Sequence, residues 1–482
     1  MNGFGALNTF TLGLYLAGTL VLGLWFSRRN RTTGDYFKGE RRIHWLVVGI
    51  SLSSVSSISY MSIPAKAYAS DWTVFFVNVP ILLLAPLIVH VFLPRFMRLR
   101  SASAYEYLET RFGVGARLYG ATAFLVFQIA RMALVIYMPA LALAAVADMD
   151  IFVCIALIGG LSAVYSALGG ISAVVWTDFA QTVFLLGAAV LAFVLVVARL
   201  DGGLAELVQT ARAADKLKLA EWSGDYTTAA FWVILTGALF SQLVPYISDQ
   251  STIQRYMTTT DVRACSRAIW ANAWLALANT AVFLAVGTAI FVFYRTRPEL
   301  LAGLPRADAI LPFFIARELP PGVAGIVVAG IFAAAQSAIS TSLNSASTVI
   351  VTDFLQRFGR ARTDGEWLVR AKWITAGLGV IAVGTASLLA ATGLASAFDA
   401  SQKILGLFGS GLAGLFILGI FTERANGRGA LCGAAASAVL IYAVQTGTRM
   451  HGYLYAAVGI ASCVGIGYAA SRLLPQRRPP AP

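Results

Sequence analysis

Long apolar runs follow one another along almost the whole chain, separated by short polar stretches. A helix needs about 20 mostly apolar residues to cross a bilayer core of about 30 Å. By that measure the pattern predicts thirteen membrane-spanning helices. Their approximate ranges are 7–27, 44–70, 74–95, 118–147, 150–168, 172–198, 228–248, 268–294, 321–353, 371–393, 396–420, 429–447 and 452–471. The longest connections are 199–227 and 295–320, and the second contains an amphipathic stretch that could form a surface helix.

The composition points to the same class of protein. Apolar residues make up 58% of the 482 residues and charged residues 12%, whereas a soluble globular chain has about 45–50% and about 25%. A soluble enzyme with several domains would need a charged surface around each core, which this composition cannot supply. The chain is therefore predicted to be an all-α integral membrane protein.

The excess of 36 Lys and Arg over 23 Asp and Glu is a topology signal. Alternate loops and the C-terminal tail hold 24 of the basic residues, and the opposite set of loops holds 9. Because basic residues are retained on the cytoplasmic side, the N-terminus is predicted outside and the C-terminus inside the inner (plasma) membrane. The first apolar run lacks the basic region and cleavage site of a signal peptide and is expected to remain a helix.

Cysteine and histidine give no support for a disulfide framework, a metal site or nucleophilic catalysis. No GxSxG, HExxH or phosphate-binding glycine loop occurs, so an enzyme is not predicted. The cysteines lie far apart and three of them fall inside apolar runs. The residues concerned are Cys154, Cys265, Cys432 and Cys463, with His44, His90 and His451.

Polar residues gather inside two of the predicted spans, where an unpartnered polar group would cost several kcal/mol. The second span contains SLSSVSSIS at 51–59, followed by Tyr60 and Pro64. Serine hydroxyls compete for backbone bonds and Pro64 lacks a donor, so this helix is predicted to be unwound or kinked in mid-membrane. Carbonyl groups freed there could bind a cation.

The ninth span carries a polar stripe at three- and four-residue spacing. Small and hydroxylated residues often serve only to let helices approach and hydrogen-bond. Two such stripes favour a site for a hard cation, because Na⁺ prefers several neutral or anionic oxygens and tolerates no basic neighbour. The stripe consists of Ser337, Ser340, Thr341, Asn344, Ser345 and Thr348.

Charged residues at membrane depth are the next candidates. Asp178 could supply an anionic oxygen to a cation, or could be hydrated near the cytoplasmic helix end. Arg131 lies too deep to reach water easily and suits bidentate pairing with a carboxylate, either Asp178 or that of a substrate. Lys66 is expected to extend to the outer surface. Lys403 and Asp399 lie one turn apart and could pair with each other.

Five motifs together resemble the sodium:solute symporter family, which includes sodium-coupled sugar, proline and sialic acid transporters. The resemblance covers nearly the whole chain. It rests on SIPAKAY at 62–68, AYEYLETRFG at 104–113, YSALGGISAVVWTDFAQ at 165–181, SDQSTIQRYM at 248–257 and SAISTSLNSASTV at 337–349. The third and fourth motifs are specific in combination.

This resemblance implies a LeuT-like fold, with a ten-helix core of two inverted five-helix repeats among thirteen helices. The first helix of each repeat is broken, the site lies between the repeats, and access alternates between the two sides. The implied divisions are 1–43 as an extra helix and cytoplasmic loop, 44–198 and 228–420 as the repeats, 199–227 as an extracellular connection, and 421–482 as two C-terminal helices and a cytoplasmic tail.

The resemblance also implies one or two sodium ions as coupling ions. Sodium site one would use Leu52, Val55, Ala334, Ser337 and Ala338, although the family usually has a second hydroxyl where this chain has Ala338. Sodium site two would use Asp178, Ser337, Ser340 and Thr341.

The likeness is greatest to bacterial sialic acid transporters, which implies symport of an anionic solute such as sialic acid. Arg131 would hold the carboxylate, Ser54, Ser56 and Ser59 would line the pocket, and Asn78 stands where those proteins have a longer amide. Other monocarboxylates, sugars, amino acids, vitamins or iodide stay open as cargo. A membrane sensor that binds solute without moving it is the alternative of a different class. The expected partners are the solute, sodium and the lipid bilayer, with no nucleic acid and with the oligomeric state open.

Overall fold

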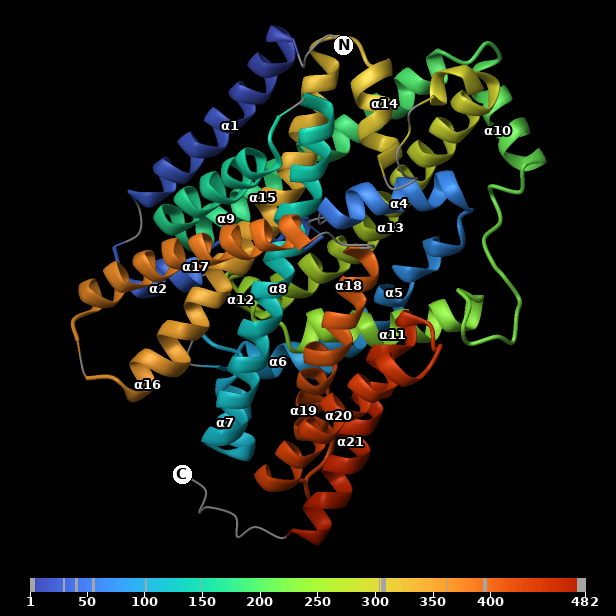
Figure 1. The fold of residues 1–482 in the computed structure, drawn as a ribbon. Coiled ribbons are helices and arrows are strands. Elements are labelled where there is room, and N and C mark those ends of the chain that lie inside the picture. The colour runs from blue at the N-terminus through green and yellow to red at the C-terminus, as the bar shows by residue number, and fades with distance from the viewer. Residues whose placement is uncertain are drawn as a thin grey trace.

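The protein, seen in a computed structural model, is an assembly of long helices (Figure 1). The structure describes residues 5–28, 31–39, 42–53, 57–99, 102–147, 149–302, 304, 309–360, 362–392 and 397–474. Within these ranges there are helices and connecting loops but no strand. The predicted all-α class is confirmed.

The described ranges contain twenty-one α-helices, joined in places by short turns of other helix types. The α-helices are α1 (Ala6–Ser27), α2 (Thr33–Lys38), α3 (Trp45–Leu52), α4 (Ser57–Ala69), α5 (Pro80–Leu87), α6 (Leu93–Phe96), α7 (Glu106–Phe112), α8 (Val114–Ala147), α9 (Ile151–Ala198), α10 (Gly203–Ala213), α11 (Phe231–Ile247), α12 (Gln250–Tyr256), α13 (Val262–Thr296), α14 (Ile310–Glu318), α15 (Val323–Val349), α16 (Gln356–Phe358), α17 (Asp364–Thr392), α18 (Ala397–Ile404), α19 (Ser410–Phe421), α20 (Gly427–Gly447) and α21 (Tyr455–Leu473). The 3₁₀ turns are η2 (Thr73–Val77), η4 (Pro298–Leu301) and η8 (Gly452–Leu454), and the π-helical turns are η3 (Ile88–Phe92), η6 (Ile350–Leu355) and η7 (Leu405–Gly409).

Ten helices in the described part of the chain are long and apolar enough to cross a membrane, and the bent pair α11 and α12 makes up to eleven. The predicted number of thirteen differs in two places. The predicted spans 150–168 and 172–198 both lie in α9, on either side of a kink. The predicted span 44–70 is divided into α3 and α4, each too short to count alone. The number thirteen stays a prediction.

The kink in α9 is made by Gly170, which has φ 60° and ψ −165°. A Cβ atom at this position would lie 2.8 Å from the carbonyl oxygen of Tyr36 in α2. The Tyr36 hydroxyl donates to the carbonyl oxygen of Ala167, three residues before the kink, at 3.1 Å. The short helix α2 is therefore seated in the bend of α9.

Gly170→Ala is expected to lower the free energy of unfolding by about 1–3 kcal/mol, because alanine is strained at this φ and its methyl group meets the Tyr36 backbone. Thermal unfolding of the detergent-solubilised protein would measure the loss. Gly160→Ala in the same helix is the matched control, since a Cβ there meets no atom within 4 Å. Equal melting temperatures for the two variants would contradict this account of the kink.

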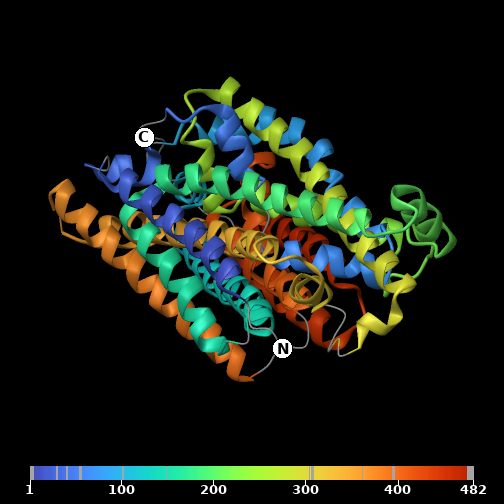
Figure 2. The same ribbon diagram turned by 90° about the horizontal axis from the view of Figure 1, so that it is seen from above.

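The centre of the molecule is α15. In its most apolar window 89% of residues are buried, compared with 17% in α1. It packs against α9, α8 and α1, and α1 lies along the outside of α9 and α15 in both views (Figures 1 and 2). The Tyr15 hydroxyl of α1 donates to Gln336 of α15 at 2.9 Å. The polar stripe of the ninth predicted span is thus at the core of the bundle.

Two helices are interrupted beside this core. Helix α3 ends at Leu52 and α4 begins at Ser57, so the predicted interruption of 44–70 is present, whereas Pro64 lies inside α4. Helix α11 ends at Ile247 and α12 follows after a bend of 60°. At that bend Asp249 caps α12 by accepting from the Ser251 backbone N–H at 2.8 Å. Interrupted helices leave backbone and side-chain groups available at membrane depth.

The connections also contain helices. The amphipathic stretch in 295–320 contains α14, a short helix whose apolar residues are buried while Arg317 is exposed. Helix α10 in 199–227 was not predicted, although the sequence of this connection contains an amphipathic helical pattern. At the C-terminal end, α20 and α21 pack against each other and against α19 (Figure 1).

A charge cluster joins the ends of α7, α8 and η6. Arg117 pairs with Asp353 at 2.7 Å and with Glu109 at 2.6 Å, and Arg357 pairs with Glu109 at 2.9 Å. Burial alone would raise the pKa of Glu109, but hydrogen bonds and charges of the two arginines outweigh it and lower that pKa. The cluster holds the start of α8, which carries Arg131, against the end of the α15 segment.

Candidate functional site

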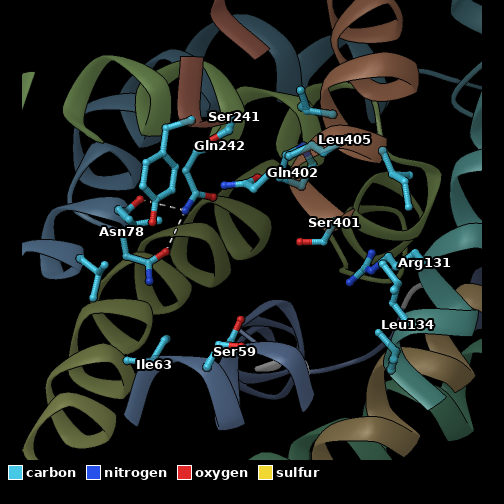
Figure 3. Close-up of a pocket in the computed structure, with 18 of the residues that line it drawn as sticks. Ser59, Ile63, Asn78, Arg131, Leu134, Ser241, Gln242, Ser401, Gln402 and Leu405 are labelled. Carbon is cyan, nitrogen blue, oxygen red and sulfur yellow. Dashed lines mark hydrogen bonds between the residues drawn. The ribbon is translucent and has the colours of Figure 1, made fainter. Parts of the chain in front are cut away.

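A cavity of about 330 Å³ lies among α4, α8, α11 and the segment α18–η7. Three of the five predicted substrate-binding residues line it: Ser59, Asn78 and Arg131. In the close-up, Arg131 and Asn78 stand on opposite sides with Ser59 between them, and Gln242 and Gln402 lie across from Ser59 (Figure 3). Ser54 and Ser56 lie outside the described residues. Cavities of this size and mixed lining are typical of small-molecule sites.

Arg131 reaches the cavity from the middle of α8. Its side chain is 32% exposed, and its nearest ion-pair partner is Asp249, with 3.8 Å between Nη1 and Oδ2. This distance is longer than a hydrogen bond. Asp249 is itself engaged by the Ser251 hydroxyl at 2.5 Å and faces the Gln128 amide at 3.4 Å. The guanidinium is therefore loosely paired, with donors available to a carboxylate in the cavity.

Both polar atoms of the Asn78 side-chain amide are hydrogen-bonded. Its Nδ2 donates to the Thr280 hydroxyl at 2.7 Å, and its Oδ1 accepts from Gln242 at 2.8 Å. These bonds connect the segment around Asn78 to α13 and α11, and the bond between Gln242 and Asn78 is seen at the cavity wall (Figure 3). Gln242 was not predicted, since one glutamine in an apolar run carries no distinctive pattern.

Asp178 is fully buried and brings together four segments. Its carboxylate accepts from Ser51 at 2.9 Å, from Ser337 at 2.7 Å and from Thr341 at 3.3 Å. These hydroxyls come from α3 and α15, so residues of both polar stripes contact Asp178. A carboxylate with three hydroxyl groups has the oxygen chemistry that a sodium ion needs.

The fourth partner of Asp178 is Arg255 of α12, which forms an ion pair with it at 2.5 Å. Arg255 also donates through Nε to Ser51 at 2.8 Å and through Nη2 to Thr341. The alternative in which Arg131 pairs with Asp178 is wrong, because Arg255 occupies that position. The expectation that no basic group would lie beside the cation site is also wrong for Asp178.

Sequence reasoning missed Arg255 because the charge count placed it in a loop. The signal was available in the resemblance: if the first helix of the second repeat is broken, then 249–257 is its second half and lies at membrane depth. Side chains throughout α12 are buried, with Arg255 3% exposed. Ser51 was noticed in the serine-rich segment but was not assigned to a site.

The other predicted sodium ligands are distributed as follows. Ser340 is buried and donates to the Ser337 carbonyl oxygen of its own helix at 3.1 Å; among the described residues it makes no hydrogen bond to Asp178. Ala334 and Ala338 are buried in α15 on either side of Ser337. Leu52 is the last residue of α3, and Val55 lies outside the described residues. The ligand sets of both sodium sites stay predictions.

The far end of the polar stripe has a packing role. Gln254 of α12 donates to Asn344 at 2.9 Å and to Thr348 at 3.0 Å, and the Ser345 hydroxyl bonds its own helix. The stripe is thus divided: Ser337 and Thr341 contact Asp178, whereas Asn344 and Thr348 join α15 to α12.

The remaining charged candidates lie away from Asp178. Lys66 is exposed, as its expected extension to the surface requires, and lines the cavity. Lys403 is exposed on α18. The Asp399 side chain lies outside the described part of the structure, so its pairing with Lys403 stays a prediction.

The chain matches the model of the sodium:solute symporter family over residues 36–436. It is 38% identical over 475 residues to the sodium/sialic acid symporter SiaT of Proteus mirabilis, covering 97% of this chain and 95% of that protein. It is 37% identical to the sodium/sialic acid symporter NanT of Aliivibrio fischeri, covering 96% and 93%. The human sodium/iodide cotransporter is 30% identical, over 93% of this chain and 71% of that protein.

The fold is also similar to that of solved transporter structures. A substrate-bound outward-open state of a Na⁺-coupled sialic acid symporter superposes with a TM-score of 0.92 at 36% identity, covering 98% of each chain. Mhp1, a transporter of the nucleobase-cation-symport-1 family, superposes with a TM-score of 0.63 at 12% identity, over 92% of this chain and 95% of that one. The second match concerns the fold alone.

Proposed function

The chain belongs to the sodium:solute symporter family, and we propose that it carries a sialic acid across the membrane together with sodium. As a member of this family it is a membrane transporter and not an enzyme. The observation that carries the choice of an anionic solute is Arg131, which faces the cavity with its ion-pair partner 3.8 Å away. The names and structures of the most similar relatives support the same choice.

The proposed path runs between the two interrupted helices. The solute carboxylate binds the Arg131 guanidinium in two charge-assisted bonds, and Ser59 and Asn78 contact the rest of the solute, with Ser54 and Ser56 as further predicted contacts. Alternating access then exposes the cavity to one side of the membrane and the other. Within this scheme 44–198 and 228–420 are the two inverted repeats, and the site lies between them.

The sodium ions are proposed at two positions on α15. Site one takes Leu52, Val55, Ala334, Ser337 and Ala338, and site two takes Asp178 with Ser337, Ser340 and Thr341. Arg255 makes site two conditional, because a cation that enters beside Asp178 must share the carboxylate with the guanidinium or replace it. Ser337 donates to Asp178 and belongs to both proposed sets, so occupation of one site is expected to affect the other.

The proposed location is the inner (plasma) membrane, with the N-terminus outside and the C-terminus in the cytoplasm. The support is the distribution of basic residues, 24 in one set of loops and 9 in the other.

Uptake into proteoliposomes tests the function. Radiolabelled sialic acid should accumulate when a sodium gradient points inward, and accumulation should stop when the gradient is abolished. Accumulation that persists without sodium would overturn sodium coupling, and a proton gradient is then the next condition. Binding of sialic acid without uptake would favour the sensor, and uptake of other carboxylates alone would reassign the cargo.

Ser337→Ala is expected to raise the sodium concentration for half-maximal uptake roughly threefold to tenfold, since one hydroxyl contact contributes about 0.5–1.5 kcal/mol. Ser345→Ala is the matched control, because the Ser345 hydroxyl bonds only within α15 among the described contacts. Sodium titrations of uptake measure both variants, with melting temperatures recorded beside them. The same sodium dependence in both would exclude Ser337 as a sodium ligand.

A further inference from the structure

A second, inner pocket of about 250 Å³ adjoins the cavity described above. The two share four lining residues: Ser59, Ile63, Asn78 and Arg131. The remaining wall of the inner pocket comes from one face of α13 and from the ends of α3 and α11, namely Leu52, Ser53, Tyr246, Asn272, Ala276, Asn279, Thr280 and Phe283. Arg131 therefore stands at the junction of two compartments.

Two asparagines of α13 line this pocket, and each has at least one buried polar atom without a hydrogen-bond partner in the described part of the chain. Asn279 is 3% exposed, and neither atom of its amide has a hydrogen-bond partner among the described residues. Asn272 is 1% exposed; its Nδ2 donates to the Tyr246 hydroxyl at 2.6 Å, but its Oδ1 has no partner in the same part of the chain. A buried amide left unpaired costs about 1–3 kcal/mol.

The arrangement on α13 is regular. Asn272, Ala276 and Asn279 lie at i, i+4 and i+7, on one face of the helix, with a rise of about 10 Å between the two amides. Ala276 lies between them on this face, and Phe283 also lines the pocket. Among the residues that line the inner pocket, Arg131 alone carries a charge.

We infer that the inner pocket binds the uncharged, hydroxyl- and amide-bearing part of the solute while Arg131 holds its carboxylate, and that Asn279 determines specificity for such solutes. This inference rests on the proposed function. A carboxamide both donates and accepts, which suits a hydroxyl group or an acylamino group equally well. Binding would satisfy the unpaired amide atoms, and a solute that lacks those groups would leave them unpaired.

The test uses the full-length protein and Asn279→Leu, which keeps the side-chain size but removes both polar atoms. Equilibrium binding would be measured in sodium for N-acetylneuraminic acid, for analogues without the N-acetyl group or with a shortened glycerol chain, and for pyruvate. Ala278→Leu is the matched control, because Ala278 is exposed and lies outside the pocket lining. Asn279→Ser replaces the leucine variant if the latter folds poorly.

Asn279→Leu should weaken N-acetylneuraminic acid binding roughly tenfold or more, with an unchanged or higher melting temperature. The analogue that lacks the group contacted by Asn279, either the N-acetyl group or part of the glycerol chain, should bind the wild-type protein more weakly by a similar factor. Its affinity should fall little further with Asn279→Leu. Ala278→Leu should change the affinity for neither N-acetylneuraminic acid nor this analogue. Wild-type affinity in Asn279→Leu, or an equal loss for every carboxylate including pyruvate, would overturn the inference. Failure of the wild-type protein to bind N-acetylneuraminic acid at all would instead refute the proposed function.

Discussion

Arg131→Ala is expected to weaken binding of a carboxylated solute by roughly tenfold to several-hundredfold, while the protein stays folded. A charge-assisted hydrogen bond contributes about 1.5–3 kcal/mol, and the fork of the guanidinium can form two to one carboxylate. Arg131→Lys should not restore affinity, because an ammonium group cannot reproduce the fork. Isothermal titration in sodium would measure both variants.

The ester of the solute supplies the discriminating comparison. If Arg131 clamps the carboxylate, the neutral ester should bind the wild-type protein weakly and should lose little more with Arg131→Ala. Additive losses from the ester and from the variant would refute the clamp. Lys66→Ala is the matched control, because Lys66 is a basic residue that lines the same cavity but is exposed. The affinity of this variant for the carboxylic acid should differ little from that of the wild-type protein.

Asp178→Asn is expected to have two separable effects, which the ion pair with Arg255 makes predictable. Removing one member of a buried pair leaves an uncompensated charge and costs about 3–5 kcal/mol. The number of sodium ions moved per solute should also fall, because the anionic ligand of proposed site two is lost. Reversal-potential measurements of uptake in proteoliposomes give that number.

The double variant Asp178→Asn with Arg255→Gln separates stability from sodium binding. It removes both charges, so most of the lost melting temperature should return, but the sodium-to-solute ratio should stay low. An unchanged ratio in Asp178→Asn would mean that Asp178 is structural and that proposed site two is wrong.

Much of the fold could be predicted because a membrane-spanning helix requires a run of about 20 apolar residues, which is visible in the sequence. The interruption after Leu52 also followed from local chemistry, since six serines within nine residues offer competing hydrogen bonds. The predicted boundary between the spans 150–168 and 172–198 falls at Gly170, but the length of the apolar runs does not distinguish two separate helices from one kinked helix. The chain continues there as one bent helix, and the positive φ depends on the close approach of Tyr36, which is 134 residues earlier.

At the candidate site, the sequence predicted which polar residues share a helix face but not which charged residues pair with each other. Periodicity brought Ser337 and Thr341 to one face, and the resemblance placed them with Asp178. Pairing is a different matter, because electrostatic partners are selected in three dimensions: two arginines and two carboxylates were available, and only the fold assigns Arg255 to Asp178 and Arg131 to Asp249. Asn272 and Asn279 were hidden for another reason, since single amides in a long apolar run resemble ordinary interhelical contacts.

The pairing of these four residues has an electrical consequence. Asp178 and Asp249 each lie with one arginine, so the two ionised pairs carry no net charge before cargo enters. Under the proposed function, the voltage across the membrane then acts on what the cargo adds. One sodium ion with one carboxylate crosses as a neutral load. A second sodium ion adds one positive charge, on which the membrane potential does about 2.3 kcal/mol of work per 100 mV, while the return of the empty carrier draws on none of it.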